Sequence, residues 1–363
     1  MNIEFKNLDI GDLRIEIPII QGGMGVRVSA EGLASAVSNE GGLGVIASVG
    51  LGGEVDGKVE DYRTSSRKSL VSTIRKTRER TKKPFGVNIM CALTNYDDLV
   101  DAAQEESIDV IISGAGLPLK LPSLLKNNKT KLLPIVSSAR AARLICLIWQ
   151  KKYNRLPDAI VVEGPLAGGH LGYSMKELDD KKNVFLDNIL KEVLIVVEGF
   201  ESPEHKIPVI AAGGIFDGED IARTIRLGAS AVQMATRFVC THECDAADGY
   251  KQAYLSAKEE DIVIIQSPVG MPGRVIRNEF VDRITRGEHI NFGCAYKCLY
   301  TCDPQKVNYC IAKALFSAAQ GRMDKGFAMC GTNAYRIKKI VSVKELFTEL
   351  VEETRMSLKN PKS

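Results

Sequence analysis

The chain has 363 residues, 45% of them hydrophobic and 26% charged, so it can bury a large core as one big domain or two ordinary ones. Its net charge of +3 is too balanced for general attraction to nucleic acid, and no apolar stretch approaches the ~20 residues of a membrane-spanning helix. The amino terminus lacks the apolar core of a signal peptide, and the odd number of cysteines, nine, favours reduced thiols over disulfides. We therefore expect a cytoplasmic protein with no nucleic-acid or membrane partner.

Eight short apolar runs alternate with longer helix-like segments. Near-continuous apolarity is typical of strands buried on both faces. The runs are Ile17 to Gln21, Leu43 to Ser48, Phe85 to Met90, Val110 to Gly114, Leu132 to Ser138, Ala159 to Gly164, Pro208 to Gly214 and Ala231 to Phe238. Eight strand–helix units in roughly 240 residues predict a (β/α)8 TIM barrel. A doubly wound sheet is the alternative, but no GxGxxG spacing of a dinucleotide-binding fold occurs.

The segments between the runs carry helix signals. After the first run, Ser29 can cap a helix that Gly41 or Gly42 ends. Two spacings, Val49 to Pro84 and Leu171 to Ile207, are longer than the rest, and we interpret them as loop elaborations around a site. The pattern changes after about residue 257. We expect a barrel over residues 1–257 and, over 258–363, a helical, cysteine-rich cap packed on it.

The carboxyl ends of barrel strands meet at one face, where active sites form. The polar residues that end the runs are predicted to share this rim: Gln21, Asn88, Ser113, Ser137, Glu163 and Gln233. The seventh and eighth runs end in AAGGI and QMATRF. The loops that follow these two strands are the usual phosphate site of such barrels, because exposed backbone N–H groups favour an anion. Gly213, Gly214 and Thr236 are the residues expected to supply it.

Several longer motifs point in the same direction. They are PIIQGGMG, EGGLGVIAS, KPFGVNIM, ISGAGLP, VEGPLAGGHLG, IPVIAAGGIFDGED and LGASAVQMATRF. Over roughly residues 15 to 275 the chain resembles the flavin-dependent family that contains nitronate monooxygenase and enoyl-acyl-carrier-protein reductase II. The resemblance implies a TIM barrel that binds FMN non-covalently, with its phosphate beside the seventh and eighth strands. The contacts it implies are Gly22, Gly23, Met24, Asn88, Glu163, Gly168, Gly169, Gly213, Gly214, Gln233, Met234, Ala235 and Thr236.

His170 is one of only four histidines, and it follows a glycine pair. A lone histidine is usually a satisfied polar residue, but this one follows the sixth run among glycines that let backbone approach a ligand. In the family the GGH histidine is catalytic, so His170 is the predicted catalytic residue. An unperturbed pKa of about 6.5 suits a group that moves a proton at a small acidic carbon compound.

The sequence leaves the reaction open between two candidates. We favour oxidation of alkyl nitronates with O2, with NAD(P)H-dependent reduction of an acyl chain carried on a protein as the alternative. A flavin-binding sensor or structural barrel is the non-enzymatic possibility. The sequence does not decide the substrate, the nicotinamide preference or the oligomeric state, a homodimer among them.

Four cysteines fall in the C-terminal segment, spaced C-x3-C-x3-C-x7-C: Cys294, Cys298, Cys302 and Cys310. Thiolates at this density can hold zinc or an iron–sulfur cluster. The spacing is not a standard signature, and on a helix the first three would lie along one face as small buried residues. We assign no metal to the catalytic site and leave a structural metal in the cap open.

Overall fold

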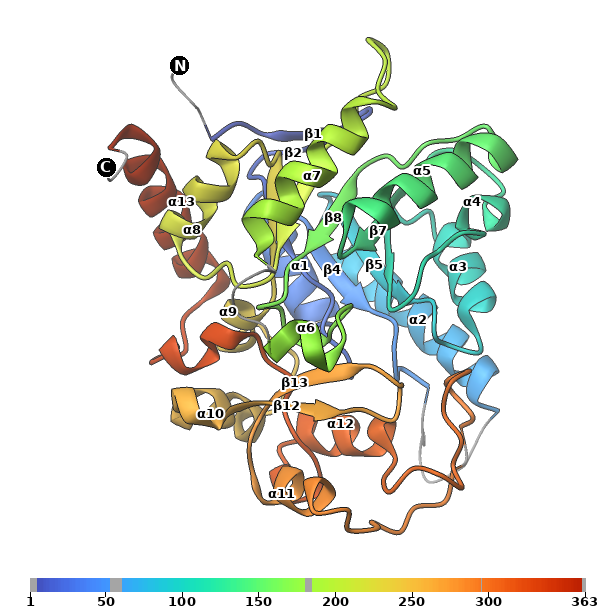
Figure 1. Cartoon of the computed structure of the whole chain (residues 1–363), viewed down its shortest axis with the longest axis vertical. Helices are drawn as coiled ribbons and strands as arrows, with labels where there is room; N and C mark the ends of the chain where they lie inside the picture. Colours follow the sequence, from blue (N-terminus) through green and yellow to red (C-terminus); the bar gives the residue numbers. More distant parts are fainter. Residues whose placement is uncertain (1–4, 53–60, 180–184, 295, 361–363) are drawn as a thin grey trace.

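Eight parallel strands form the centre of the molecule (Figure 1). The structure, a computed structural model, describes residues 5–52, 61–179, 185–294 and 296–360. The strands are β3 (Ile19–Gln21), β4 (Gly44–Ala47), β5 (Phe85–Met90), β6 (Val110–Gly114), β7 (Lys131–Val136), β8 (Ile160–Glu163), β10 (Val209–Ala212) and β11 (Ala231–Met234). Their order in the sheet is β3-β11-β10-β8-β7-β6-β5-β4. A parallel bridge between Ile20 and Leu43 closes the ring, so the predicted TIM barrel is confirmed over the doubly wound sheet.

Apolar side chains fill the inside of the barrel. Residues such as Ile20, Ile112 and Ile210 form one fully buried cluster, as expected for strands covered on both faces. A hairpin of β1 (Leu8–Ile10) and β2 (Leu13–Ile15) contributes to the same cluster. Figure 1 shows this hairpin at the end of the barrel away from β12 and β13, so it closes the amino-terminal end and leaves the carboxyl end for a ligand.

Helices surround the barrel, and their inner faces form a second apolar layer. They are α1 (Glu31–Asn39), α2 (Tyr62–Arg80), α3 (Tyr96–Glu105), α4 (Leu121–Leu124), α5 (Ala139–Tyr153), α6 (Met175–Asp179), α7 (Leu186–Glu198), α8 (Gly218–Arg226) and α9 (Thr236–Val239). We had interpreted the two long spacings, Val49 to Pro84 and Leu171 to Ile207, as loop elaborations. Most of their described residues instead form the barrel helices α2 and α7. Residues 53–60 and 180–184 within them lie outside the described residues.

The start of α1 corrects a prediction about its cap. Ala30 is the N-cap residue, and the Ser29 hydroxyl accepts a hydrogen bond from Met24 N at 2.8 Å instead of capping the helix. The cap comes from Asp245, whose carboxylate accepts from the N–H groups of Ala30 at 2.7 Å and Gly32 at 2.9 Å. A carboxylate there also suits the positive end of the helix dipole. This long-range cap ties the first helix to the loop after β11.

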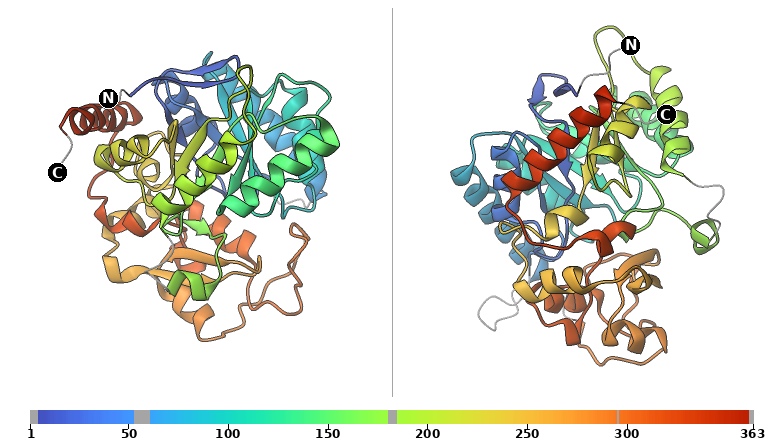
Figure 2. Two further views of the ribbon diagram at one scale, coloured as in Figure 1. Left: turned by 45° about the horizontal axis from the view of Figure 1, so that its top comes forward. Right: turned by 90° about the vertical axis from the view of Figure 1, so that its left-hand side faces the viewer.

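The chain after β11 builds a lobe across the carboxyl end of the barrel (Figure 2). Its elements are α10 (Asp248–Ser256), η1 (Glu259–Asp261), β12 (Ile262–Gln266), β13 (Pro272–Ile276), α11 (Glu279–Thr285), α12 (Ile311–Ala319), η2 (Met323–Lys325) and η3 (Thr332–Arg336). We call this lobe, residues 248–336, the cap. The short strand β9 (Gly169–His170) leaves the barrel and pairs antiparallel with β13, so the cap and the barrel share a sheet.

The last helix, α13 (Val343–Lys359), returns to the side of the barrel. It lies along α8, and the Gly218 N–H donates to the Glu353 carboxylate at 2.9 Å. A capping box at Ser342 and Glu345 starts it. The division at residue 257 stays a prediction, but the region after it contains this barrel-bound helix as well as the cap.

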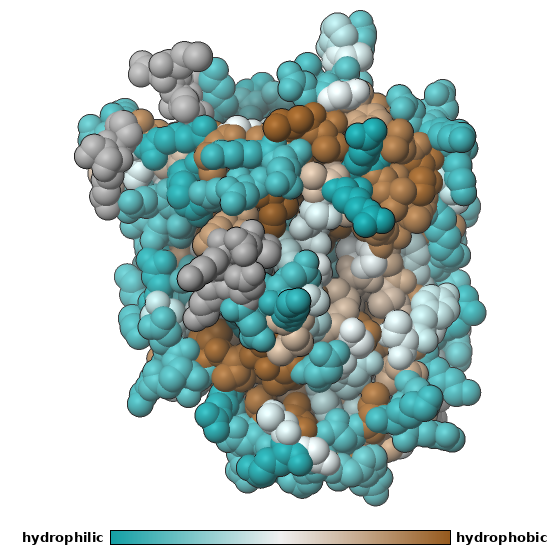
Figure 3. Space-filling model, in the orientation of Figure 1, coloured by the Kyte–Doolittle hydropathy of each residue, from teal (hydrophilic) through white to brown (hydrophobic). Residues whose placement is uncertain are grey.

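Apolar side chains gather on one part of the surface, over α5 and α7 (Figure 3). Leu144 and Leu147 of α5 and Ile195 of α7 are among the exposed large hydrophobic residues. Across the described ranges no helix has both the length and the apolar character to cross a membrane. All nine cysteines are free thiols.

Candidate functional site

A cavity lies between the carboxyl ends of the barrel strands and the cap. All the residues assigned from the sequence to catalysis or flavin binding line it: Gly22, Gly23, Met24, Asn88, Glu163, Gly168, Gly169, His170, Gly213, Gly214, Gln233, Met234, Ala235 and Thr236. They come from the carboxyl-terminal parts of five barrel strands and from the segments that follow these strands. The structure therefore brings them together, and their individual roles stay predictions.

Three of the six predicted rim residues do not line the cavity. Gln21 is fully buried and bonds to backbone, its amide donating to the Gly22 carbonyl at 2.6 Å. The Ser113 hydroxyl donates to the Ile89 carbonyl at 2.9 Å, and that of Ser137 donates to a carbonyl at 3.0 Å. These strand-end polar groups stabilise the barrel rim, because polar side chains removed from water need partners. The expectation that all six converge on one site was wrong for them.

The loops after β8, β10 and β11 offer backbone to a ligand. Gly213 and Gly214 have φ of 92° and 85°, a conformation that side-chain-bearing residues rarely adopt. At Gly168 a Cβ would lie 2.5 Å from the carbonyl carbon of Cys330, so only glycine fits between this loop and the cap. The cap also holds the loop after β10, because Asn333 Nδ2 donates to the Gly214 carbonyl at 2.8 Å. Two of the predicted backbone contacts are thus fixed by the cap.

Gln233 presents an unusual polar group. Its side-chain oxygen is buried and has no hydrogen-bond partner among the described residues, although Gln233 lines the cavity. An unpaired buried amide oxygen costs about 1–3 kcal/mol. A ligand with an N–H or O–H group at that point would remove the cost.

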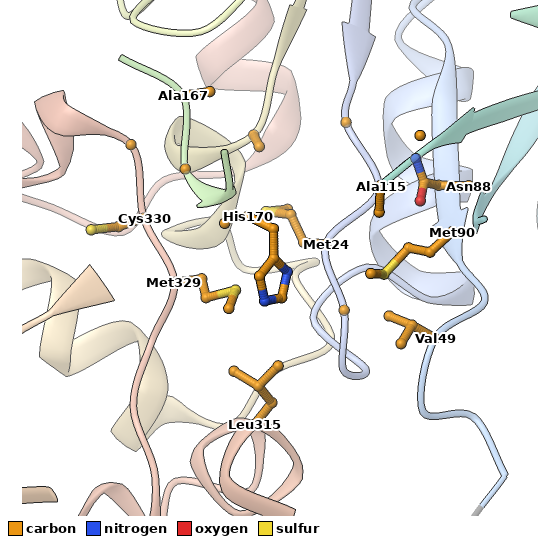
Figure 4. A pocket seen from close by; sticks show the side chains of 18 of the residues that line it. Met24, Val49, Asn88, Met90, Ala115, Ala167, His170, Leu315, Met329 and Cys330 are labelled. Carbon is orange, nitrogen blue, oxygen red and sulfur yellow. The ribbon is translucent and has the colours of Figure 1, made fainter. Parts of the chain in front are cut away.

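His170 is placed differently from its sequence prediction. It does not end a barrel strand but lies on β9, seven residues after β8, and pairs with Gly273 of β13. Its Nε2 lies 2.8 Å from the Ser267 hydroxyl oxygen, and the ring projects into the cavity between Met24 and Met329 (Figure 4). The antiparallel pairing to the cap therefore sets the position of the imidazole. Ser267 was not predicted from the sequence, because it lies beyond residue 257, where the alternation of apolar runs and helices ends.

The hydrogen bonds around Ser267 indicate which ring nitrogen carries the proton. The Ser267 hydroxyl oxygen accepts from Val269 N at 3.2 Å, and among the described residues the only acceptor within reach of its hydroxyl proton is His170 Nε2. A hydroxyl rotates to suit its neighbours, and we infer that Ser267 donates to Nε2. The neutral imidazole then carries its proton on Nδ1, which has no partner within the described part of the chain. His170 thus offers a ligand an N–H donor.

Burial shifts the pKa values of an imidazole and a carboxyl group that line the cavity in opposite directions. It lowers the pKa of His170 to about 4 and raises the pKa of Glu163 to about 7. In both cases loss of water disfavours the charged form. Near pH 6 both groups are neutral, although they are an acid and a base that line one cavity. Such pairs with divergent pKa values mark many active sites.

Arg274 positions the segment that carries His170. It is buried, and its guanidinium donates to the carbonyl of Pro165 at 2.9 Å and to that of Ala167. Its backbone pairs with Gly169. One residue of β13 thereby holds the loop after β8 through both side chain and backbone. This role could not be predicted from the sequence, because the partners are about a hundred residues apart.

The wall facing His170 is apolar. Figure 4 shows Val49 from the loop after β4 and Met90 from the end of β5, with Leu315 and Met329 from the cap. Methionine side chains adapt to irregular shapes, and they exclude water. Sequence reasoning missed these residues because their apolar character does not distinguish them from the core.

The family of the chain follows from comparison with known proteins. The family model described as nitronate monooxygenase matches residues 6–107 and 94–353. The chain belongs to the nitronate monooxygenase family. It is therefore an oxidoreductase of a family whose members depend on flavin.

Relatives within the family carry different names. A probable nitronate monooxygenase from Staphylococcus aureus strain Newman is 30% identical over 312 residues, which cover 76% of this chain and 79% of the relative. The "(3aS,4S,5R,7aS)-5-hydroxy-7a-methyl-1-oxo-octahydro-1H-indene-4-carboxyl-CoA dehydrogenase" of Mycobacterium tuberculosis is 33% identical over 75% of this chain. The match spans 66% of that dehydrogenase and 65% of its Rhodococcus jostii counterpart, slightly under two thirds of each.

Solved structures show the same architecture. FabK from Thermotoga maritima is 33% identical, covers 94% of both chains and superposes with a TM-score of 0.74. Nitroalkane oxidase from Streptomyces ansochromogenes has a TM-score of 0.71 over 96% of this chain at 22% identity, which supports the fold alone. The nitronate monooxygenase family thus contains relatives that act on different substrates, and the reaction must be argued from the site.

Proposed function

We propose that the chain binds FMN in the cavity and uses it to oxidise alkyl nitronates with O2. The observation that carries this proposal is His170, a half-buried neutral imidazole whose inferred Nδ1–H faces the cavity. A nitronate is an anion with two oxygens, and it needs such a donor in a site that excludes water. We place this reaction in the cytoplasm, with a small molecule as substrate.

The residues present fit FMN. The Gly213–Gly214 backbone and Thr236 would hold the phosphate, since exposed backbone N–H groups favour anions. Gln233 would meet the polar edge of the ring system, which supplies the partner that its side-chain oxygen lacks. Gly169 leaves room for the flat ring to approach backbone, whereas the absent side chain of Gly168 makes room for the cap backbone at Cys330. When bound, FMN supplies the electron transfer that no protein side chain provides.

The chain's own residues orient the substrate and exclude water. His170 Nδ1 donates a hydrogen bond to a nitronate oxygen, and Ser267 and Arg274 keep the imidazole in place. Because Nε2 is occupied by Ser267, no lone pair of the ring faces the cavity. His170 therefore serves as a donor to a pre-ionised nitronate, not as the base that removes a proton from a neutral nitroalkane. Met24, Met90 and Leu315 keep the site dry.

Enoyl reduction is the second candidate, and a specific observation favours it. The cap adds Val269, Leu315 and Met329 to the wall of the cavity, which suits an acyl chain better than a small nitronate. In this case NAD(P)H would be the reductant, and His170 Nδ1 would donate to the thioester carbonyl.

Anaerobic mixing distinguishes the two reactions. The purified chain should carry FMN, seen in its absorption spectrum and identified by mass after release. If the proposal holds, an alkyl nitronate bleaches the flavin and NADH or NADPH does not. Bleaching by a nicotinamide alone would transfer the assignment to enoyl reduction. A chain that binds no flavin from a full FMN titration would overturn both.

A further inference from the structure

Exposed apolar side chains lie along the outer side of two neighbouring barrel helices, α5 and α7. Leu144 and Leu147 of α5 are 39% and 45% exposed, and their spacing of three residues places them on one side of the helix. Ile195 of α7 is 71% exposed. Figure 3 shows apolar side chains gathered over both helices. We call the outer sides of α5 and α7 together the α5–α7 face.

The apolar residues of α5 are flanked by cations. The helix carries four basic side chains and no acidic one. All four are exposed: Arg140, Arg143, Lys151 and Lys152. Within the described part of the chain, none of them forms an ion pair. The positive charge of α5 is therefore not balanced inside the molecule.

Helix α7 carries the opposite charge. Glu192 and Glu198 are exposed and, across the described ranges, form no ion pair. Asp187 pairs with Arg223 of α8, and Lys191 is the only cation in the sequence of the helix. The α5–α7 face thus consists of a basic half and a mainly acidic half, with apolar side chains on both.

The cation-rich helix α2 shows the usual arrangement in this barrel. Its Arg63 pairs with Asp98 of α3 at 2.7 Å, and its Arg75 pairs with Glu106 after α3 at 2.7 Å. Helices α5 and α7 lie side by side in the same way, as Figure 1 shows, yet their opposite charges do not pair. The charges of the α5–α7 face are therefore available to a partner outside the chain.

The mixture of charges indicates which partner fits. An acidic protein or an anionic membrane would be attracted by the cations of α5 but repelled by Glu192 and Glu198 beside them. A second copy of this chain carries both signs in the same layout, and a two-fold axis makes the contact between two identical faces reciprocal. A second copy is therefore the occupant that can pair the basic and the acidic half at once.

Charge also selects one of the two ways in which identical faces can meet. An axis that crosses the helices would lay α5 on the α5 of the partner subunit, so that cations meet cations. An axis along the helices lays α5 on the α7 of the partner subunit, so that a basic helix meets an acidic one twice. Both helices follow a barrel strand and run in the same direction, so Lys151 in the last turn of α5 then lies near the partner's Glu198.

We propose that the α5–α7 face is the contact of a homodimer, in which α5 of each copy packs on α7 of the other. Helices of about 20 Å that lie about 10 Å apart give a face of roughly 400 Å² in projection, which is at the small end of specific interfaces. The dimer should therefore dissociate in the micromolar range. No residue of α5 or α7 lines the cavity, so the inference does not depend on the flavin reaction.

Sedimentation velocity of the full chain tests the dimer, over a roughly hundredfold range of concentration around micromolar. We expect the sedimentation coefficient to rise from that of one chain to that of two. Ile195→Asp should weaken association by about tenfold or more, because it places a carboxylate in the centre of the contact. Met356→Asp changes a methionine of α13 that is 59% exposed, and it is the matched control that should associate like the wild type. Circular dichroism shows that both variants fold.

Charge reversal tests the orientation. Lys151→Glu and Glu198→Lys should each weaken association, and the double variant should restore it, because the pairs form again with exchanged signs. A chain that stays monomeric over the whole range, or a dimer that Ile195→Asp leaves intact, would overturn the contact. A dimer that Lys151→Glu strengthens, or a double variant no better than the single ones, would overturn the packing of α5 on α7.

Discussion

Replacing Ser267 with alanine tests how the imidazole works. The hydroxyl lies 2.8 Å from His170 Nε2, and Ser267 is 3% exposed, so water cannot take its place readily. Leaving a buried acceptor without its partner costs about 1–3 kcal/mol. In Ser267→Ala the proton can move to Nε2, and the Nδ1–H donor is then lost from part of the molecules. At about 1.4 kcal/mol for each factor of ten, kcat/KM with a nitronate should fall about 5- to 150-fold.

Two measurements check this expectation. The first is kcat/KM for a pre-ionised nitronate, with FMN content determined on the same preparation. The second is nitrogen NMR of protein labelled in histidine, which distinguishes a proton on Nδ1 from one on Nε2. His170→Ala assigns the signal among the four histidines. Ser267→Thr keeps a hydroxyl and should restore most of the rate.

The result expected for Ser267→Ala differs from the result expected if the serine has only a structural role. Ser267→Ala must keep its flavin and its fold while the tautomer changes. If the wild-type signal shows the proton on Nε2, or if Ser267→Ala loses rate only in proportion to lost FMN, then His170 is not fixed as an Nδ1–H donor and the argument fails.

Two further changes probe the cofactor site. Gly214→Asp should bind FMN more weakly than Gly214→Asn, because like charges about 4 Å apart repel by ~4 kcal/mol at an effective dielectric near 20. Gly214→Asn is the matched control, since both variants have the same positive φ and the same crowding against Leu166. Equal dissociation constants for the two variants, measured by fluorescence titration, would place the phosphate elsewhere. Glu163→Gln should stabilise the flavin-free protein at pH 8 by up to about 3 kcal/mol. The pKa of Glu163 is about 7 in the folded protein and 4.5 in the unfolded chain, so the stability of the wild-type protein falls as the pH rises from 4.5 to 7. Urea unfolding of both proteins from pH 4.5 to 8 measures this, and parallel curves would show that Glu163 titrates normally.

The barrel could be predicted from the sequence because its signals are local. Each strand is buried on both faces, so each appears as a short apolar run, and the chain order of runs and helices fixes the topology. The role of Gly213 and Gly214 could be predicted for the same reason, since they directly follow a strand whose carboxyl end faces the site. These are the parts of the cavity that the sequence predicted.

The cap contributions could not be predicted, because they depend on contacts between distant residues. The strand that carries His170 has two residues, and it exists only because β13 lies beside it. The cap of α1 is a carboxylate more than two hundred positions away, so the nearby Ser29 misled the prediction. Ser267 and Arg274 look like ordinary polar residues until the fold places them beside His170 and its loop.

In the proposed reaction the cavity would meet a charged substrate without using a free charge of its own. At neutral pH His170 is uncharged, Glu163 is close to its midpoint, and the buried guanidinium of Arg274 is occupied by the carbonyls of Pro165 and Ala167. Burial is the common cause, since it penalises whichever form carries charge. An anionic oxygen in this cavity must then be stabilised by dipoles fixed in advance, and these cost no reorganisation during the reaction. The Nδ1–H group of His170 is such a dipole, and its direction is set by Ser267 in the cap.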